Sequence, residues 1–449
     1  MKYVYLLLKI LLGLGLLTVV ALLACLAPVD NTPYQQMPFY TQTKQRLTEL
    51  AKPPEAKAQL RAGWAKVSLV PPFTTPTGGY GVRRSKHWTT ILDSILVRAI
   101  VLDNGATKVA IVSADLLIIP PTVSAILKKR LAEVGFSWNN VYFGAVHSHN
   151  SLGGWAPGMI GELFAGGYDE RVENFVAEKI IKAIRAAAKN CAAVRVGYTQ
   201  ADASSQVYNR VFDNKKDTDG LIRAIKLQKN TGESALICSF AAHSTVLGAE
   251  QWKYLSRDYP GVLVDELEKK SGDFALFLAG AVGGMGPDVV GEGDSARLQN
   301  QGRALVQKIG ETLPNLQMVN DNTLKILTLP LTLREPHARV WENWRVRPWL
   351  FYAVYGDYPA DLKVLRIGNT VLAGTPCDFS GFLVPDFQVI AAKKEINLMI
   401  TGFNGGYVGY ITPDRLYNLD NYETQTMNWF GPQNAAYFEE LMKGLIEKL

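Results

Sequence analysis

The chain has 449 residues, of which 48% are apolar and 20% charged, so it is long and apolar enough to form one large or two ordinary globular domains. The net charge of +6 comes from 47 basic and 41 acidic residues with no long Lys/Arg run, which argues against nucleic-acid binding. The four cysteines include no Cys-x-x-Cys pair, which argues against a cysteine-based structural zinc site and a disulfide framework.

The first predicted element is an apolar N-terminal segment. Ile10 to Pro28, with the residues before Lys9, is long enough to cross roughly 30 Å of hydrocarbon. Leu22-Leu23-Ala24-Cys25 is close to a bacterial lipobox, so cleavage and lipidation at Cys25 compete with retention as a spanning helix. We favour the retained anchor, because Leu at the second position before the cysteine suits a lipobox poorly. Lys2 and Lys9 then leave the body of the chain outside the cytoplasm, beside a membrane.

We expect three parts along the chain. Residues 1–28 form a signal anchor or lipoprotein signal, and residues 29–54 form a polar, Pro-containing tether. Residues 55–449 form one large domain, because no repeat, low-complexity tract or further linker interrupts them.

Within that domain, strand-like and helix-like stretches alternate. Apolar, β-branched runs predict strands at Ile91–Leu102, Lys108–Ile119, Asn140–Val146, Val194–Tyr198, Ile222–Gln228, Ser234–Ala242, Phe274–Ala279, Thr323–Leu333 and Leu362–Leu372. Helical periodicity predicts helices at Val123–Val134, Tyr168–Asn190, Pro260–Lys270, Ser295–Leu313 and Gln433–Lys448. This order predicts an α/β fold with mixed β-sheets flanked by helices.

Two of the five histidines stand where the strand Asn140–Val146 ends, in His147-Ser148-His149-Asn150, just before Gly153-Gly154. Imidazole is a common metal ligand and titrates near neutrality, so such a pair indicates a metal or catalytic site. A His-x-His pair that is hydrogen-bonded in the core explains the pattern equally well.

Other polar residues also follow predicted strands. His243 comes directly after Ser234–Ala242, Asp378 follows Leu362–Leu372, and Tyr410 stands in a Gly-rich turn. Each has an ordinary alternative, because a lone histidine is usually structural, an aspartate can cap a helix and a tyrosine can pack in a turn. The Gly-rich loop from Gly280 to Asp288 lacks Gly-Lys-Ser/Thr, so it is not a nucleotide P-loop.

The stretch from Arg339 to Tyr352 interleaves tryptophan with arginine. This mixture suits a membrane interface or the rim of an acyl-chain cleft. Arg–Trp stacking on an ordinary surface is the plainer explanation.

Taken together, these segments resemble the catalytic N-terminal domain of the neutral/alkaline, non-lysosomal ceramidase family, from about Ala62 to Ala435. The matching segments are His147-Ser148-His149-Asn150 with Gly153-Gly154, Asn209-Arg210, Phe240-Ala241-Ala242-His243, Leu255-Ser256-Arg257-Asp258, Pro376-Cys377-Asp378-Phe379-Ser380, and Gly409-Tyr410-Ile411-Thr412-Pro413 followed by Tyr422-Glu423 and Gly431-Pro432. No single match is specific, but their order and the spacing between the two motif tyrosines argue against chance.

The resemblance implies a Zn²⁺ site with four ligands, which are His147, His243, Asp378 and Tyr410. Nitrogen and oxygen ligands suit a catalytic zinc site better than a closed structural one. Asp378 stands where the family has glutamate, which shortens one ligand arm by a methylene.

The resemblance also implies roles beside the metal. His149 would act as a proton carrier or a hydrogen-bonding partner. Arg210 and Tyr422 would donate hydrogen bonds to the substrate carbonyl or to the oxyanion that develops from it, where fixed donors stabilise charge that appears in the transition state.

One departure from the family concerns its Gly-Asp-Val-Ser-Pro-Asn motif. This chain has Gly283-Gly284-Met285-Gly286-Pro287-Asp288 there, so Gly286 stands at the serine position. A mechanism that needs the serine hydroxyl cannot operate. Water activated by a metal does not need it, and His149 or Asp288 would then move the proton.

The leading hypothesis is a membrane-anchored, periplasmic or cell-surface zinc hydrolase that cleaves the amide of an N-acylated lipid or related amphiphile. One alternative is a non-catalytic lipid- or glycan-binding relative, because the motif serine is absent. Another is a zinc esterase or lactonase, which keeps the metal and changes the bond.

Overall fold

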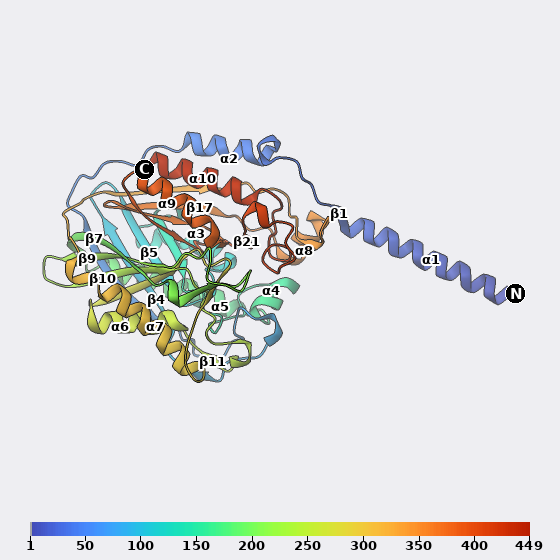
Figure 1. The fold of residues 1–449 in the computed structure, drawn as a ribbon, viewed down its shortest axis with the longest axis horizontal. Helices are drawn as coiled ribbons and strands as arrows, with labels where there is room; N and C mark the ends of the chain where they lie inside the picture. The colour runs from blue at the N-terminus through green and yellow to red at the C-terminus, as the bar shows by residue number, and fades with distance from the viewer. Residues whose placement is uncertain (1) are drawn as a thin grey trace.

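The computed structural model describes residues 2–449 and shows four layers, in the order helices, sheet, sheet, helices (Figure 1). The larger sheet has eight strands in the order β12-β10-β9-β7-β2-β4-β5-β6, with parallel pairs at its two edges and antiparallel pairs between them. These strands are β2 (Arg61–Ser68), β4 (Leu96–Asp103), β5 (Lys108–Ala114), β6 (Val141–Ala145), β7 (Ala192–Asp202), β9 (Leu221–Lys229), β10 (Ser234–Phe240) and β12 (Phe274–Ala279).

A four-stranded sheet packs face to face against the larger one. Its strands are β14 (Leu324–Pro330), β17 (Asp361–Ile367), β18 (Thr370–Gly374) and β20 (Asn397–Thr401), in that order. Ile100 and Leu102 of β4 share a core with Leu365 and Leu372 of the second sheet, whereas Val97 of β4 faces the outer helices. Burial on both faces explains the apolar run from Ala99 to Leu102 in β4.

Helices cover the two outer faces. α3 (Pro121–Arg130), α5 (Glu170–Ala188), α6 (Tyr259–Lys270) and α7 (Asp294–Gly310) pack on the eight-stranded sheet, and α2 (Pro38–Glu49), α9 (Val384–Lys393) and α10 (Asn434–Lys448) pack on the four-stranded sheet. In α5, Val172, Val176, Ile180 and Ile184 repeat every four residues and are all buried, and the carboxylate of Asp169 accepts from a backbone N–H of the first turn. The predicted mixed α/β fold is confirmed.

Some predicted elements differ from the structure. The predicted strand Leu362–Leu372 is wrong as a single element, because it is two antiparallel strands, β17 and β18, that turn at Gly368 with φ of 56°. The short helices α4 (Gly158–Ala165) and α8 (Pro348–Tyr355) were not predicted. Eight residues give too few turns for a periodicity to emerge from one sequence.

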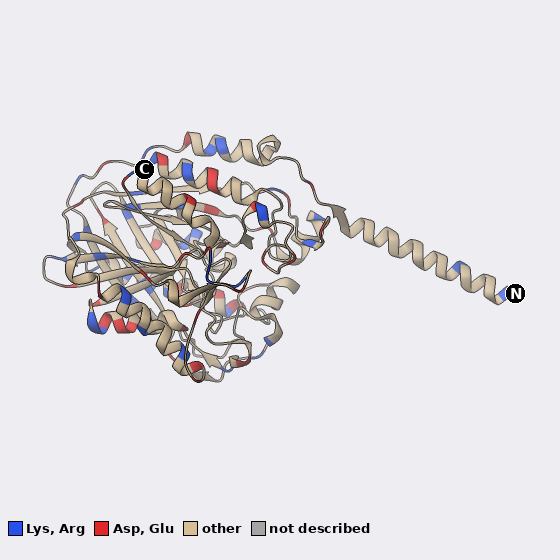
Figure 2. Ribbon diagram, in the orientation of Figure 1, with Lys and Arg blue, Asp and Glu red and all other residues tan. Residues whose placement is uncertain are grey.

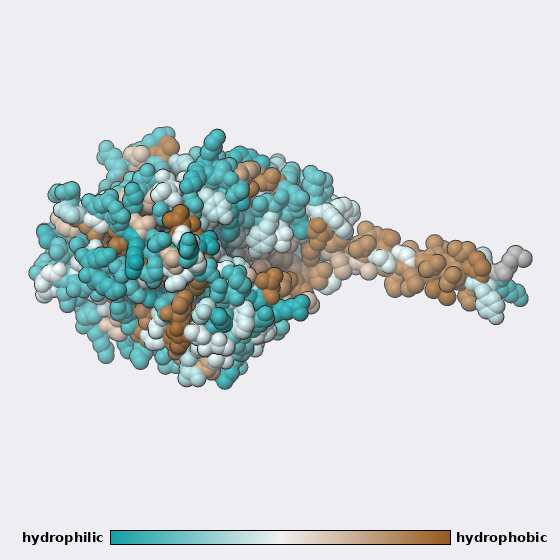
Figure 3. Space-filling view, turned by 60° about the horizontal axis from the view of Figure 1, so that its bottom comes forward, coloured by the Kyte–Doolittle hydropathy of each residue, from teal (hydrophilic) through white to brown (hydrophobic). Residues whose placement is uncertain are grey.

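The apolar N-terminus forms α1 (Lys2–Cys25), which projects from the domain and is long and apolar enough to cross a membrane (Figures 1 and 3). Only Lys2 and Lys9 charge this helix, whereas both signs of charge intermingle over the domain (Figure 2). α1 runs directly into β1 (Leu26–Pro28), which pairs with β16 (Trp344–Val346), and β16 pairs with β15 (Arg339–Trp341).

Residues 29–54, where we expected a tether, contain α2, which lies against α10. The Phe39 ring meets Tyr437 edge-on at 5.1 Å, and Lys44 forms an ion pair with Glu440 at 2.7 Å. Most of this segment therefore packs on the outer helical layer.

Candidate metal centre

Segments from both sheets meet at the centre. His147 follows β6 and His243 follows β10, both in the eight-stranded sheet. Asp378 begins β19 (Asp378–Phe379) just after β18, and it lies opposite Tyr410 of β21 (Tyr410–Ile411) in a two-stranded parallel pair. The structure therefore brings together all four side chains that the sequence proposed as ligands.

Backbone carbonyls fix the orientation of two of the histidines. Nδ1 of His147 lies 2.8 Å from the carbonyl oxygen of Leu117, and Nδ1 of His243 lies 3.0 Å from that of Met285. A carbonyl oxygen only accepts hydrogen bonds, so each Nδ1 carries the proton and each Nε2 turns an unprotonated lone pair towards the centre. Burial, together with the charge of Arg210, lowers the pKa of His243 to about 3, which keeps that ring neutral.

Asp378 lies close to both of these imidazoles. Its Oδ1 lies 3.3 Å from Nε2 of His147 and 3.2 Å from Nε2 of His243, and its Oδ2 accepts a hydrogen bond from the Tyr407 hydroxyl at 2.7 Å. The buried Oδ1 has no hydrogen-bond donor among residues 2–449.

This arrangement fits a metal ion. Lone pairs of two imidazoles point at a carboxylate oxygen that also carries lone pairs, and a cation between them satisfies all three. Donor atoms bound tetrahedrally at roughly 2.0–2.1 Å lie about 3.3 Å from one another, which agrees with the separations of 3.2 and 3.3 Å here. The hydroxyl of Tyr410 is 3.1 Å from Nε2 of His243, so it also belongs to the set.

Arg210 supplies a fixed positive charge beside the centre. Its Nη2 lies 3.0 Å from both Nε2 of His243 and the Tyr410 hydroxyl. Its Nε forms an ion pair with Glu423 at 2.6 Å, and Glu423 also accepts from the backbone N–H of Gly284 at 2.7 Å. Glu423 had no predicted role, although it follows Tyr422 in the closing sequence motif, and that adjacency is the signal that could have found it.

His149 and Tyr422 lie beside the four proposed ligands. Nε2 of His149 is 3.4 Å from Nε2 of His147, and the nitrogens of His147, His149 and His243 all lie within 4.8 Å of one another. Burial lowers the pKa of His149 well below its usual value. The Tyr422 ring lies edge-on to Tyr410 at 6.0 Å and lines the cavity above the centre.

The structure does not bring Asp288 to this group. Its carboxylate forms an ion pair with the exposed Lys215, and it is not among the residues in 2–449 that line the cavity.

Gly286, at the family's serine position, lies in β13 (Met285–Pro287) opposite Tyr208 of β8 (Val207–Asn209), and a side chain on residue 286 would overlap the Tyr208 ring. The space for a serine is therefore filled.

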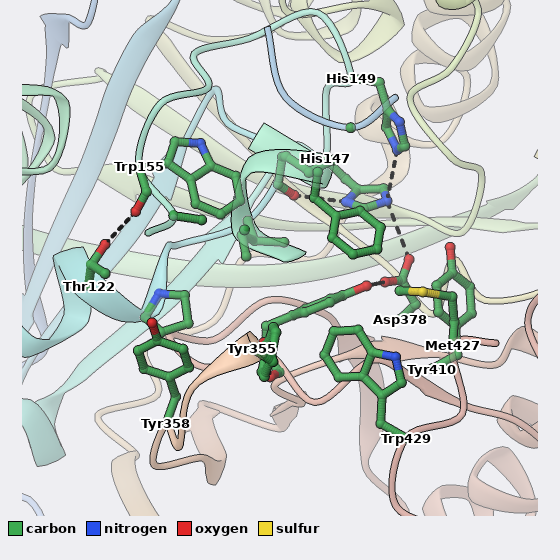
Figure 4. A pocket seen from close by; sticks show the side chains of 18 of the residues that line it. Thr122, His147, His149, Trp155, Tyr355, Tyr358, Asp378, Tyr410, Met427 and Trp429 are labelled. Atoms are coloured by element: carbon green, nitrogen blue, oxygen red, sulfur yellow. Dashed lines mark hydrogen bonds and ion pairs between the residues drawn. The ribbon is translucent and has the colours of Figure 1, made fainter. Parts of the chain in front are cut away.

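A cavity opens above the centre (Figure 4). His147, His149, Asp378 and Tyr410 line one side of it. Seven aromatic side chains contribute to the remaining wall, which are Trp155, Phe164, Tyr355, Tyr358, Tyr407, Tyr422 and Trp429. Because Asp378 is the only Asp, Glu, Lys or Arg among the lining residues, the cavity suits a neutral, largely apolar ligand.

Part of this sequence is similar to a known protein family, and the fold is similar to solved structures. Residues 72–294 match the family model of the neutral/alkaline non-lysosomal ceramidase N-terminal domain. The neutral ceramidase from Pseudomonas aeruginosa matches with a TM-score of 0.73 and 19% identity, over 87% of this chain and 75% of that chain. A ceramidase complexed with C2 matches with a TM-score of 0.73 and 18% identity, over 88% and 76% of the two chains. None of the curated protein sequences matches the chain.

Only part of the candidate metal centre lies in the segment that the family model matches. His147, His149, Arg210 and His243 fall inside residues 72–294, whereas Asp378 lies beyond that segment. At the identities found, the two solved structures establish the fold alone. Residues 72–294 therefore match the neutral/alkaline non-lysosomal ceramidase family that the sequence motifs predicted.

Proposed function

We propose that the chain is a zinc-dependent amidohydrolase that cleaves the amide of a neutral N-acylated lipid such as ceramide. The observation that carries the proposal is the buried Oδ1 of Asp378, which faces the lone pairs of His147 and His243 without a donor. These three residues and Tyr410 would hold the ion. Zn²⁺ in a nitrogen and oxygen site acts as a Lewis acid and activates water at neutral pH.

The side chains around this group would handle the substrate. Arg210, held by Glu423, and Tyr422 on the cavity wall would orient the amide carbonyl and stabilise charge on its oxygen. Water adds to the carbonyl carbon, the C–N bond breaks, and the leaving nitrogen gains a proton. His149 is the residue placed to hold that proton at Nε2, whereas Asp288 is paired with Lys215 instead.

The cavity and α1 support this substrate class. The aromatic, uncharged wall would bind an acyl chain and exclude bulk water from the amide. A chain retained through α1 would keep the centre on the extracytoplasmic side of a membrane, where amphiphilic substrates reside.

Zinc content and deacylation of a panel of N-acyl lipids, measured on the same preparations, test the proposal. The wild type should bind about one zinc ion per chain. His147→Ala and Asp378→Ala should lose zinc and at least about a hundredfold in activity. His87→Ala is the matched control, because His87 is exposed and lies outside the centre.

The outcome also separates the other hypotheses. A wild type without metal, or activity untouched by Asp378→Ala, would overturn the proposal. Turnover restricted to esters or lactones would change the bond that is cleaved and keep the metal. Zinc binding without turnover of any amide or ester would indicate a binding protein.

A further inference from the structure

The end of α1 is fixed to the domain rather than joined to it by a flexible link. The last carbonyl groups of a helix have no partners within it. Here the carbonyl of Leu23 accepts from Nε of Arg347 at 2.9 Å, that of Ala24 from the indole N–H of Trp349 at 3.0 Å, and that of Cys25 from the backbone N–H of Arg347 at 2.8 Å. The pairing of β1 with β16 then continues the connection.

Two tryptophans of the three-stranded sheet β1-β16-β15 lie beside α1, the helix that would cross the membrane. Trp341 and Trp344 line an apolar groove with residues of α1 from Val19 to Leu23 and with Leu26. Val19 is six residues before Cys25, which is about 9 Å along a helix. The two indoles therefore overlap the last turns of α1, at the depth where tryptophan is enriched in membrane proteins.

The sequence segment that interleaves tryptophan with arginine left two explanations open. The structure shows no guanidinium over the rings of Trp341, Trp344 or Trp349 anywhere in residues 2–449, and Arg339 lies over Tyr417 instead, at 3.8 Å from the ring centroid. Trp341 is 60% exposed and Trp349 is 56% exposed. Arg–Trp stacking therefore does not explain these side chains.

Further apolar side chains extend this surface. α4 packs against α8, and both lie on the side of the domain from which α1 leaves (Figure 1). Met159 and Leu163 of α4 are 74% and 52% exposed, and Figure 3 shows hydrophobic surface continuing from α1 onto the domain at its base. We define the apolar rim as six exposed side chains, which are Met159, Leu163, Trp341, Trp344, Trp349 and Tyr352.

The same two helices also form part of the cavity. Trp349 in the first turn of α8 contacts the end of α1, and Tyr355 at the end of α8 lines the cavity. Eight helical residues span about 12 Å, so a short helix connects the end of α1 with the cavity wall. Gly161 and Phe164 of α4 line the cavity from the other side of this contact.

We propose that the apolar rim docks on the extracytoplasmic face of the bilayer that α1 crosses, and that the lipid substrate enters the cavity along α4 and α8 directly from the bilayer. The partner that the apolar rim contacts is a lipid surface, because the rim is continuous with an apolar helix of spanning length and lies at the end of that helix. The route of entry rests on the proposed function, whereas the docking does not.

The first experiment measures docking without using activity. Full-length wild type is reconstituted in phosphatidylcholine vesicles that contain lipids brominated near the headgroup end of the acyl chain. Trp341, Trp344 and Trp349 should be quenched, so a variant with all three replaced by phenylalanine should lose the quenched part of the emission. Equal quenching of wild type and this variant overturns the proposal, as does cross-linking of the rim into a dimer in place of quenching.

The second experiment measures entry from the bilayer. Met159→Asp combined with Leu163→Asp should lower turnover of an N-acyl lipid embedded in vesicles at least about tenfold, because two charges replace side chains that would be buried in lipid. Turnover of a water-soluble short-chain amide should stay within about twofold, since neither residue lines the cavity. Val389→Asp on α9 is the matched control, because Val389 is 55% exposed and lies outside the rim.

The two readouts keep the proposals separate. No turnover of either amide by the wild type would refute the amidohydrolase, while the quenching still decides the docking. Equal loss on both substrates in the double variant would overturn entry along the rim.

Discussion

His147 adopts a left-handed backbone conformation with φ of 62°, which costs a non-glycine residue about 1–3 kcal/mol. Its ring stacks on Phe403 at 4.3 Å, and Phe403 is itself left-handed with φ of 65°. The hydrogen bond from Nδ1 to Leu117 and this stacking hold the imidazole in one orientation. Strain of this kind is concentrated where a side chain must point in one direction, here towards Asp378.

Gly286 stands at the family's serine position, so the Gly286→Ser substitution tests whether a serine there contributes to activity in this chain. Gly286→Ser should not raise activity, because the Tyr208 ring fills the space beside residue 286. The overlap should lower the free energy of unfolding by about 1–3 kcal/mol. Thermal unfolding and deacylation measured on the same preparations check both statements.

Tyr208→Ala in the same chain provides the control. It opens the space, so the double variant should be more stable than the two single losses added together predict. A Gly286→Ser variant as stable as wild type would show that Tyr208 swings aside readily, and a gain in rate would show that a serine there can still take part.

At the scale of elements, the centre connects the two sheets. His147 and His243 follow strands of the eight-stranded sheet, whereas Asp378 and Tyr410 belong to segments that follow the four-stranded sheet. A metal ion held by all four would therefore join the two halves of the core. Binding to the folded state alone stabilises it, and the unfolded chain has no such site.

Metal removal should therefore destabilise the whole domain. At a free zinc concentration roughly a thousand times Kd, the holo protein should be more stable than the apo protein by about 4 kcal/mol. The checking measurement is the midpoint of thermal unfolding with zinc and after chelation. Asp378→Ala should abolish the difference, and Asp288→Ala should preserve it because Asp288 pairs with Lys215 outside the centre. Equal midpoints for holo and apo wild type would show that the ion does not link the sheets.

The sequence located most strands of the two large sheets because their runs are apolar on both faces, as in β12, which matches the predicted Phe274–Ala279, but it missed β2 and β20. It could not locate the turn at Gly368, because a hairpin between two buried strands leaves the apolar pattern unbroken. Motif order identified the residues now seen around Asp378. The hydrogen bonds of Glu423 and Tyr407 escaped notice, since such contacts depend on loops that meet only in three dimensions.

At the scale of the whole molecule, the N-terminal segment after α1 is held against the domain. The division at residues 28 and 54 stays a prediction, but the backbone around it is held closely. The carbonyls of Asp30 and Thr32 accept from the guanidinium of Arg334 at 2.9 and 2.6 Å, and that of Pro28 accepts from Arg345 at 3.2 Å. The chain between α1 and α2 is thus clamped by arginines.

His337 makes this clamp sensitive to acid. Its Nδ1 lies 2.6 Å from the carbonyl oxygen of Glu335, so its Nε2 is the acceptor for the backbone N–H of Asp30 at 3.2 Å. Protonation would remove that acceptor and place a third cation beside Arg334 and Arg345. Burial, opposed by the Glu335 carbonyl, lowers the pKa of His337 to about 4.

Acid should therefore weaken the folded state through His337. Because its pKa is lower in the folded than in the unfolded chain, where it is 6.5, its contribution to stability is complete above pH 6.5 and is lost as the pH falls towards 4. The full difference is about 3 kcal/mol. His337→Gln keeps an acceptor for Asp30 but does not titrate, so its unfolding free energy should fall less than that of wild type between about pH 7 and about pH 4.5, by about 2–3 kcal/mol. His87→Gln, on an exposed residue, should behave as wild type. Equal acid sensitivity of wild type and His337→Gln would show that the clamp does not depend on this proton.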